Sequence, residues 1–145
     1  MYQWVLIAHS LGRWLVLVAG AIVVFVETAR LWSGKSWAPI GPQLGRVFKI
    51  SVDVQVLMGA ALYLLLSPLT TVVLSTTITR LPGDSDAQFF SVVHPVIMMA
   101  AFIGVHVSSV FIHRGRNDAS RHRRSIMFYG VLLLLLLSGT PWWRP

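Results

Sequence analysis

The stretch that decides the fold is WVLIAHSLGRWLVLVAGAIVVFV, residues 4–26. It is mostly apolar, but His9 and Arg13 lie one helical turn apart near its start. A helix needs about 20 consecutive, predominantly apolar residues to cross a hydrocarbon core ~30 Å thick. The stretch meets that length, and no basic segment of the kind found in a signal peptide precedes it. We therefore expect a first transmembrane helix over residues 4–26.

Three further apolar stretches, residues 47–66, 91–112 and 126–142, predict three more spans. The composition agrees, because 55% of the 145 residues are hydrophobic and 12% are charged, whereas a soluble domain has about 25% charged residues. Lipid offers the backbone no hydrogen-bond partners, so each span must be helical. The sequence thus predicts a single domain, residues 1–145. Its expected fold is all-α, an integral membrane protein with an up-down four-helix transmembrane bundle.

The basic residues collect in the first connection, residues 27–46, and in the third, which lie on the same side because two crossings separate them. The third connection, residues 113–124, holds five arginines. The positive-inside rule places both connections in the cytoplasm, and the two termini and the long connection 67–90 outside. In that long connection, Pro68 predicts the end of a helix and residues 81–84 predict a turn. Orientation and anionic lipids explain the net charge of +7 better than nucleic acid does.

Ionisable side chains inside predicted spans are candidate functional residues, because their burial in lipid is unfavourable. His9 lies ~7 Å and His94 ~5 Å inside the outer ends of their spans, at about 1.5 Å per residue. The first and third helices start from the same side and are diagonal neighbours in an up-down bundle. We therefore expect the two imidazoles to hold one haem iron between them. Arg13 shares a helix face with His9 and is the expected partner of the haem propionates.

Simpler roles for both histidines remain open. His9 could form a hydrogen bond with the second connection at the interface. His94 precedes Pro95 at a helix start, so it could be a cap residue near the head groups. Neither role requires the two histidines to lie at the same level.

Asp53 and His106 are predicted at a similar level in the cytoplasmic half. They are expected to form a structural pair, or else to contact protons or a quinone head group. Asp53 could instead meet Arg13. A second haem is not expected, because His106 is turned roughly 120° from His94 around the helix. Two histidines in the basic connection are expected to be solvated: His113 and His122.

The pattern resembles small four-helix bacterial membrane proteins of the b-type cytochrome superfamily, the group that includes copper-resistance D-like and related membrane haem proteins. The matching motifs are His9-Ser10-x-x-Arg13-Trp14, His94 with Met98, Asp118 and Arg121-His122-Arg123 in the basic connection, and Pro141-Trp142. The resemblance implies haem b held by histidines, and electron transfer to or from quinones or partner subunits. It also implies a place in the bacterial inner membrane. Two-haem members need four suitably placed histidines, and this chain supplies two.

The leading hypothesis is therefore an electron-transfer protein or subunit with one haem b on the outer side. The alternative is a non-catalytic accessory subunit of a larger respiratory or photosynthetic complex, without its own cofactor. A third hypothesis, a small transporter or channel, rests on Arg13, Asp53 and His106 alone. No nucleophile–base constellation or phosphate-binding loop predicts a catalytic residue. The absence of cysteine excludes thiolate metal sites and covalently attached haem.

Overall fold

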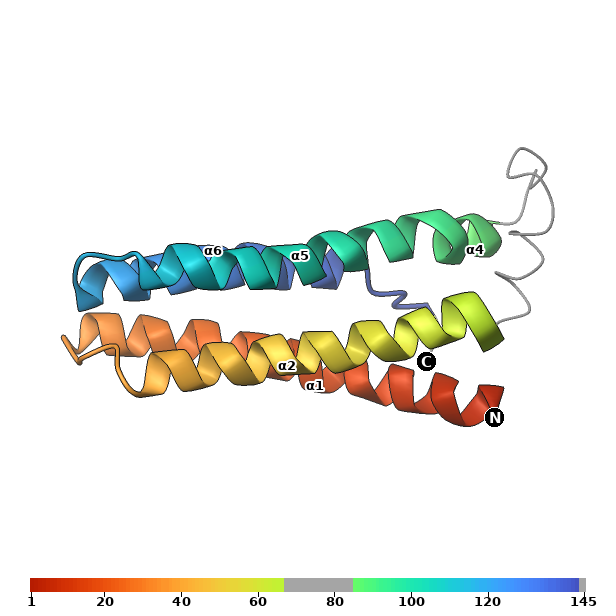
Figure 1. Cartoon of the computed structure of the whole chain (residues 1–145), viewed down its shortest axis with the longest axis horizontal. Helices are drawn as coiled ribbons and strands as arrows, with labels where there is room; N and C mark the ends of the chain where they lie inside the picture. Colours follow the sequence, from red (N-terminus) through yellow and green to blue (C-terminus); the bar gives the residue numbers. More distant parts are fainter. Residues whose placement is uncertain (67–84, 144–145) are drawn as a thin grey trace.

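A computed structural model describes residues 1–66 and 85–143, and within them the chain is helical with no strand (Figure 1). The helices in chain order are α1 (Tyr2–Trp32), α2 (Ile40–Ala61) with a π-helical turn (Leu62–Leu66), α4 (Ser85–Gln88) with a second π-helical turn (Phe89–Val93), α5 (His94–His113) and α6 (Asp118–Ser138).

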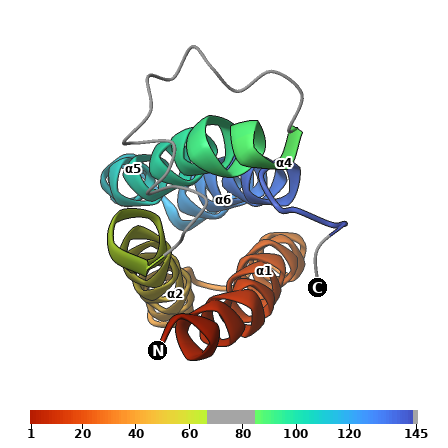
Figure 2. The same ribbon diagram turned by 90° about the vertical axis from the view of Figure 1, so that its right-hand side faces the viewer.

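The four long helices form an antiparallel bundle. Helix α1 packs against α2 and α6, while α5 packs against α6 and less extensively against α2. The end-on view shows α1 and α5 on opposite corners (Figure 2). The all-α four-helix bundle expected from the sequence is confirmed. Its core is made of apolar side chains from all four helices, among them Val23, Phe48, Val52, Val105, Ile112 and Leu132.

By length and composition, three helical segments in the described residues are suited to cross a membrane: Tyr2–Trp32, Ile40–Leu66 and Phe89–His113. Large apolar side chains such as Leu15, Phe25 and Leu65 are exposed on the outside of the bundle. That surface is compatible with contact with a lipid bilayer. Helix α6 is not among the three, since arginines occupy its first turns and its apolar part is short.

The helices near the basic connections are longer than predicted. Helix α1 continues to Trp32, so Glu27 lies inside it rather than in a connection. Helix α2 begins at Ile40 instead of 47. Pro42 is tolerated there because the first turn of a helix makes no use of its backbone N–H groups. The predicted end at Pro68 and the predicted turn at 81–84 lie outside the described residues.

Helix α6 is displaced relative to its predicted span of 126–142. It begins at Asp118, where the Asn117 side chain accepts a hydrogen bond of 2.8 Å from the backbone N–H of Ser120. This is an N-terminal cap. The helix ends at Ser138 because Pro141 cannot continue the hydrogen-bond ladder.

The early end of α6 leaves carbonyl groups that need other donors. The hydroxyl of Thr140 donates to the Leu136 carbonyl at 2.8 Å, and the indole of Trp142 donates to the Leu137 carbonyl at 3.0 Å. The Gly139 carbonyl remains available to a neighbouring helix. After this point the chain leaves the helix and runs toward the end of the bundle where α1 begins (Figure 1).

The contact between α2 and α6 depends on a glycine. A Cβ atom at Gly45 would lie 2.6 Å from the Tyr129 hydroxyl, and the Tyr129 ring is held edge-on to Phe48. We predict that Gly45→Ala forces these helices apart and lowers stability in detergent by about 1–3 kcal/mol. Thermal unfolding followed by circular dichroism measures this.

The matched control is Gly130→Ala on α6, where an added Cβ meets no atom within 4 Å. It should leave stability unchanged or raise it by up to about 1 kcal/mol, because alanine favours helix more than glycine. Equal effects of the two substitutions would contradict this account of the α2–α6 contact.

Candidate functional site

The structure brings together the two histidines that the sequence singled out. Their rings, on α1 and α5, have centroids 6.2 Å apart and planes 81° apart. His9 and His94 thus meet across the diagonal of the bundle, near the end where α1 begins. We call His9, His94 and the adjoining Gln55, Gly59 and Gly139 the histidine site.

His94 is oriented by the end of α6. Its Nδ1 lies 2.8 Å from the Gly139 carbonyl oxygen. A carbonyl only accepts hydrogen bonds, so Nδ1 carries the proton, and Nε2 of the neutral ring keeps a lone pair. Histidines that bind metals are commonly oriented in this way by a backbone carbonyl.

His9 is held through its backbone. The Gln55 side chain of α2 donates a 2.7 Å hydrogen bond to the His9 carbonyl. The ring nitrogen Nδ1 of His9 is buried and has no hydrogen-bond partner among the described residues. Gly59 faces the ring closely, and a Cβ there would lie 3.0 Å from His9 Cε1. The ring therefore has a buried nitrogen without a protein partner and a small neighbour.

Aromatic rings border His94 on the side of the second π-helical turn. The ring centroids of Phe89 and Phe90 lie 5.8 and 6.0 Å from that of His94. Phe89 in turn packs against Trp143, with ring centroids 4.8 Å apart. These rings give the histidine site an apolar border.

The two ring centroids are 6.2 Å apart, a separation typical of an edge-to-face ring contact. A metal ion held by one nitrogen of each ring would give a similar separation of about 6 Å. The described residues contain no cluster of three or more His, Asp or Glu side chains suited to hold a metal ion. His9 and His94 could hold the iron of a haem, a metal that brings its other ligands with it.

Arg13 lies one turn further along α1 and is half-buried. Its guanidinium group is 5.5 Å from the centre of the Trp14 ring. Trp14 is edge-on to Trp142, with ring centroids 6.1 Å apart. The structure thus places Arg13 beside the tryptophan pair that joins α1 to the C-terminal segment.

Asp53 meets His106 rather than Arg13. The His106 Nε2 and Asp53 Oδ1 atoms are 3.5 Å apart. His106 Nδ1 donates a 2.9 Å hydrogen bond to the Phe102 carbonyl, which fixes the orientation of the ring. This pair lies near the middle of the helical segment Ile40–Leu66, deeper in the bundle than the histidine site, and shares no residue with it.

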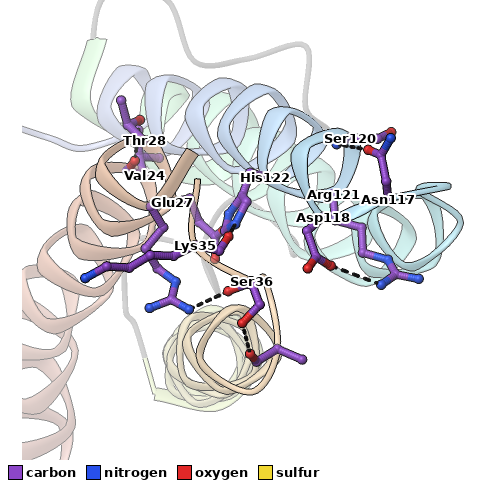
Figure 3. A network of polar contacts seen from close by, with 12 residues as sticks. Val24, Glu27, Thr28, Lys35, Ser36, Asn117, Asp118, Ser120, Arg121 and His122 are labelled. Carbon is purple, nitrogen blue, oxygen red and sulfur yellow. Dashed lines mark hydrogen bonds and ion pairs between the residues drawn. The ribbon is translucent and has the colours of Figure 1, made fainter. Parts of the chain in front are cut away.

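A buried acid–base pair lies near the end of the bundle where α6 begins, and the sequence analysis missed it (Figure 3). His122 Nδ1 is 2.6 Å from Glu27 Oε2, and His122 Nε2 is 3.0 Å from the Lys35 carbonyl oxygen. Glu27 is 0% exposed and His122 is 1% exposed. The prediction that His122 is solvated is wrong, whereas His113 is exposed as expected.

The position of Glu27 on α1 explains its burial. Val16, Gly20, Val23 and Glu27 are buried and follow one another at intervals of four, three and four residues. They form one inward face of the helix. This spacing can be read from the sequence. It predicts that Glu27 points into the bundle only if the helix is taken to continue past Val26.

The Glu27–His122 pair joins three segments of the chain. His122 Nε2 faces a carbonyl and so donates to it. Its Nδ1 then either donates a hydrogen bond to the Glu27 carboxylate as part of an imidazolium, or accepts a hydrogen bond from the carboxylic acid. In both states, the pair connects α1, the connection at Lys35 and the first turns of α6.

We predict that Glu27→Ala destabilises the protein by about 3–5 kcal/mol, because it leaves a buried imidazole without its partner. Glu27→Gln should lose much less, since the amide can still donate to Nδ1 of a neutral His122. Chemical unfolding in detergent measures both.

The control is Asp118→Ala, which removes an exposed ion pair with Arg121 and should change stability by about 1 kcal/mol or less. Similar losses from Glu27→Ala and Asp118→Ala would show that the buried pair does not stabilise the bundle.

Comparison with known proteins adds no assignment. No protein-family model, no curated protein and no solved structure matches this chain.

Proposed function

We propose that this chain is a membrane-embedded, haem b-binding electron-transfer protein or subunit, with one haem held by His9 and His94. The observation that carries the proposal is the meeting of two imidazoles from diagonal helices, 6.2 Å between ring centroids. Two histidines with separate structural roles do not need to lie at the same depth in the bundle. Haem ligation requires the same depth, because one iron must reach both rings.

The residues around the two imidazole rings also favour a haem. Hydrogen bonding of Nδ1 to Gly139 fixes the His94 ring and makes Nε2 a stronger ligand. Gly59 lets the His9 ring pack directly against α2, and the rings of Phe89 and Phe90 border His94 with apolar surface. Arg13 is the residue proposed to bind the propionates, since guanidinium pairs with carboxylates. When bound, the haem supplies one-electron redox chemistry, whose potential is tuned by the axial ligands and by burial.

The proposed location is the bacterial inner membrane. The helical segments Tyr2–Trp32, Ile40–Leu66 and Phe89–His113 are apolar and long enough to span it. We propose α6, which packs against α1 and α5, as the fourth span. The arginine-rich connection between α5 and α6 lies at the same end as the connection between α1 and α2 (Figure 1). The positive-inside rule puts this end in the cytoplasm and the histidine site near the outer face. The resemblance to membrane cytochromes of the b type suggests quinones or partner subunits as electron donors and acceptors.

The second candidate is an accessory subunit without a cofactor. It is favoured by the Asp53–His106 pair, whose side chains are 32% and 42% exposed on the outside of the bundle. An exposed acid–base pair in an apolar surface favours contact with another protein. The two candidates are compatible if the haem lies within a subunit.

The test is the reduced-minus-oxidised visible spectrum of protein purified in detergent from cells with ample haem. We predict the sharp bands of a low-spin b-type haem in the unaltered chain and in His113→Ala, which removes an exposed histidine of the same helix as His94. The bands should be lost in His9→Ala and in His94→Ala.

A misfolded variant is distinguished from a lost ligand by adding imidazole to His94→Gly. Imidazole should restore the bands if the variant is folded and lacks only the axial ligand. A colourless unaltered protein, or a His9→Ala variant with an unchanged spectrum, would rule out the proposal.

A further inference from the structure

The outer faces of α2 and α5 share an unusual surface. On α5 it comprises Met99, Ile103, His106 and Val110, and on α2 it comprises Ile50, Asp53 and Leu57. Successive members are three or four residues apart, so each set lies along one face of its helix. We call these seven residues the α2/α5 stripe. Its five apolar members are exposed, and its two ionisable members lie in contact at its centre.

The depth of the ionisable pair makes its exposure unfavourable in lipid. Asp53 is the middle residue of the 27-residue helical segment Ile40–Leu66. Ionisable side chains at such a depth normally face protein or water rather than hydrocarbon. The other exposed helix faces carry large apolar side chains, such as Phe25 on α1 and Val131 on α6. The α2/α5 stripe is therefore a surface where protein contact is favoured over lipid.

The chemistry of the stripe is self-complementary. The acid lies on α2 and the base on the neighbouring, antiparallel α5 (Figure 2). A two-fold rotation about an axis parallel to the helices sets α2 of one copy against α5 of the other. Each Asp53 then faces His106 of the second copy as well as its own. The 3.5 Å contact within one chain leaves acceptor capacity on the Asp53 carboxylate for that second imidazole.

We propose that a second copy of this chain covers the α2/α5 stripe and forms a two-fold symmetric dimer in the membrane. Spacings of three and four residues are those of helices that pack side by side at shallow angles. Polar side chains at the centre of such a seam fix its register and its partner. An interface of this kind uses the same patch on both copies, as two-fold symmetry requires. The inference rests on the membrane placement proposed above and is independent of the haem.

The test uses cysteine crosslinking, which is simple here because the chain has no cysteine. Two differently tagged chains are co-expressed, one with Ile103→Cys and the other with Leu57→Cys. The two positions lie one turn from His106 and Asp53 respectively, toward the same end of the bundle. Each chain carries one cysteine, so a disulfide between the two tags can form only between two chains.

The matched control pairs Ile103→Cys with Val131→Cys on α6. Val131 is exposed and lies near the depth of Ile103, because neighbouring Leu132 packs against Gly104 of α5. Under mild oxidation of carbonate-washed membranes, we expect the Ile103/Leu57 pair to form the mixed disulfide at about ten times the yield of the control. Adding Asp53→Leu and His106→Leu to both chains should lower that yield by about tenfold, the effect expected of an interhelical polar contact.

Equal yields for the two pairs would overturn the dimer, as would crosslinks to a different protein in place of the second copy. Absence of crosslinks in chains retained in the washed membranes would also overturn it, while leaving the membrane placement intact. Recovery of the chain in the soluble fraction would overturn the placement and the dimer together. The visible spectrum of the same preparation reports separately on the haem.

Discussion

The hydrogen bond from His94 to the Gly139 carbonyl links the chemistry of this protein to its fold. It exists because α6 stops at Ser138 and leaves the last carbonyl groups without helical donors. Thr140 and Trp142 satisfy two of these carbonyl groups from the C-terminal segment, and His94 satisfies another from across the bundle. The geometry of the two imidazoles therefore depends on where a helix ends as well as on where the histidines stand in the sequence.

Three pairs of ionisable side chains lie at different depths in the bundle. Glu27 with His122 closes one end, Asp53 with His106 lies between α2 and α5, and His9 with His94 lies near the other end. The first pair is fully buried, and His122 makes two hydrogen bonds, one to Glu27 and one to the Lys35 carbonyl, which suits a structural role. The pair of histidines differs, because two imidazoles cannot neutralise one another. This difference in chemistry singles out the histidine site as the candidate for a cofactor.

The sequence predicted the four helices from the length of their apolar stretches. It also predicted a similar depth for His9 and His94, because helices of alternating direction start α1 and α5 from the same end of the bundle. It also predicted the Asp53–His106 contact, since helix rise places the two residues at similar depths. It failed near the basic connections, where charged residues resemble the end of a span. Glu27 was assigned to a connection for this reason, although α1 continues to Trp32 and turns the carboxylate inward.

The burial of His122 was beyond the reach of sequence patterns for a related reason. Its neighbours in the chain are arginines, so the local pattern is that of a solvated segment. Its burial depends on Glu27 and on the Lys35 carbonyl, both distant in the sequence. The early end of α6 was signalled by Pro141, but the apolar residues on either side favoured a longer span.

We propose that one haem iron is held between His9 and His94. Electron paramagnetic resonance of the oxidised, purified protein, together with the number of haems per chain, tests this ligation. We expect one haem per chain and a low-spin ferric signal from two nitrogen ligands. A high-spin signal from the bound haem, or a haem content far from one per chain, would contradict it.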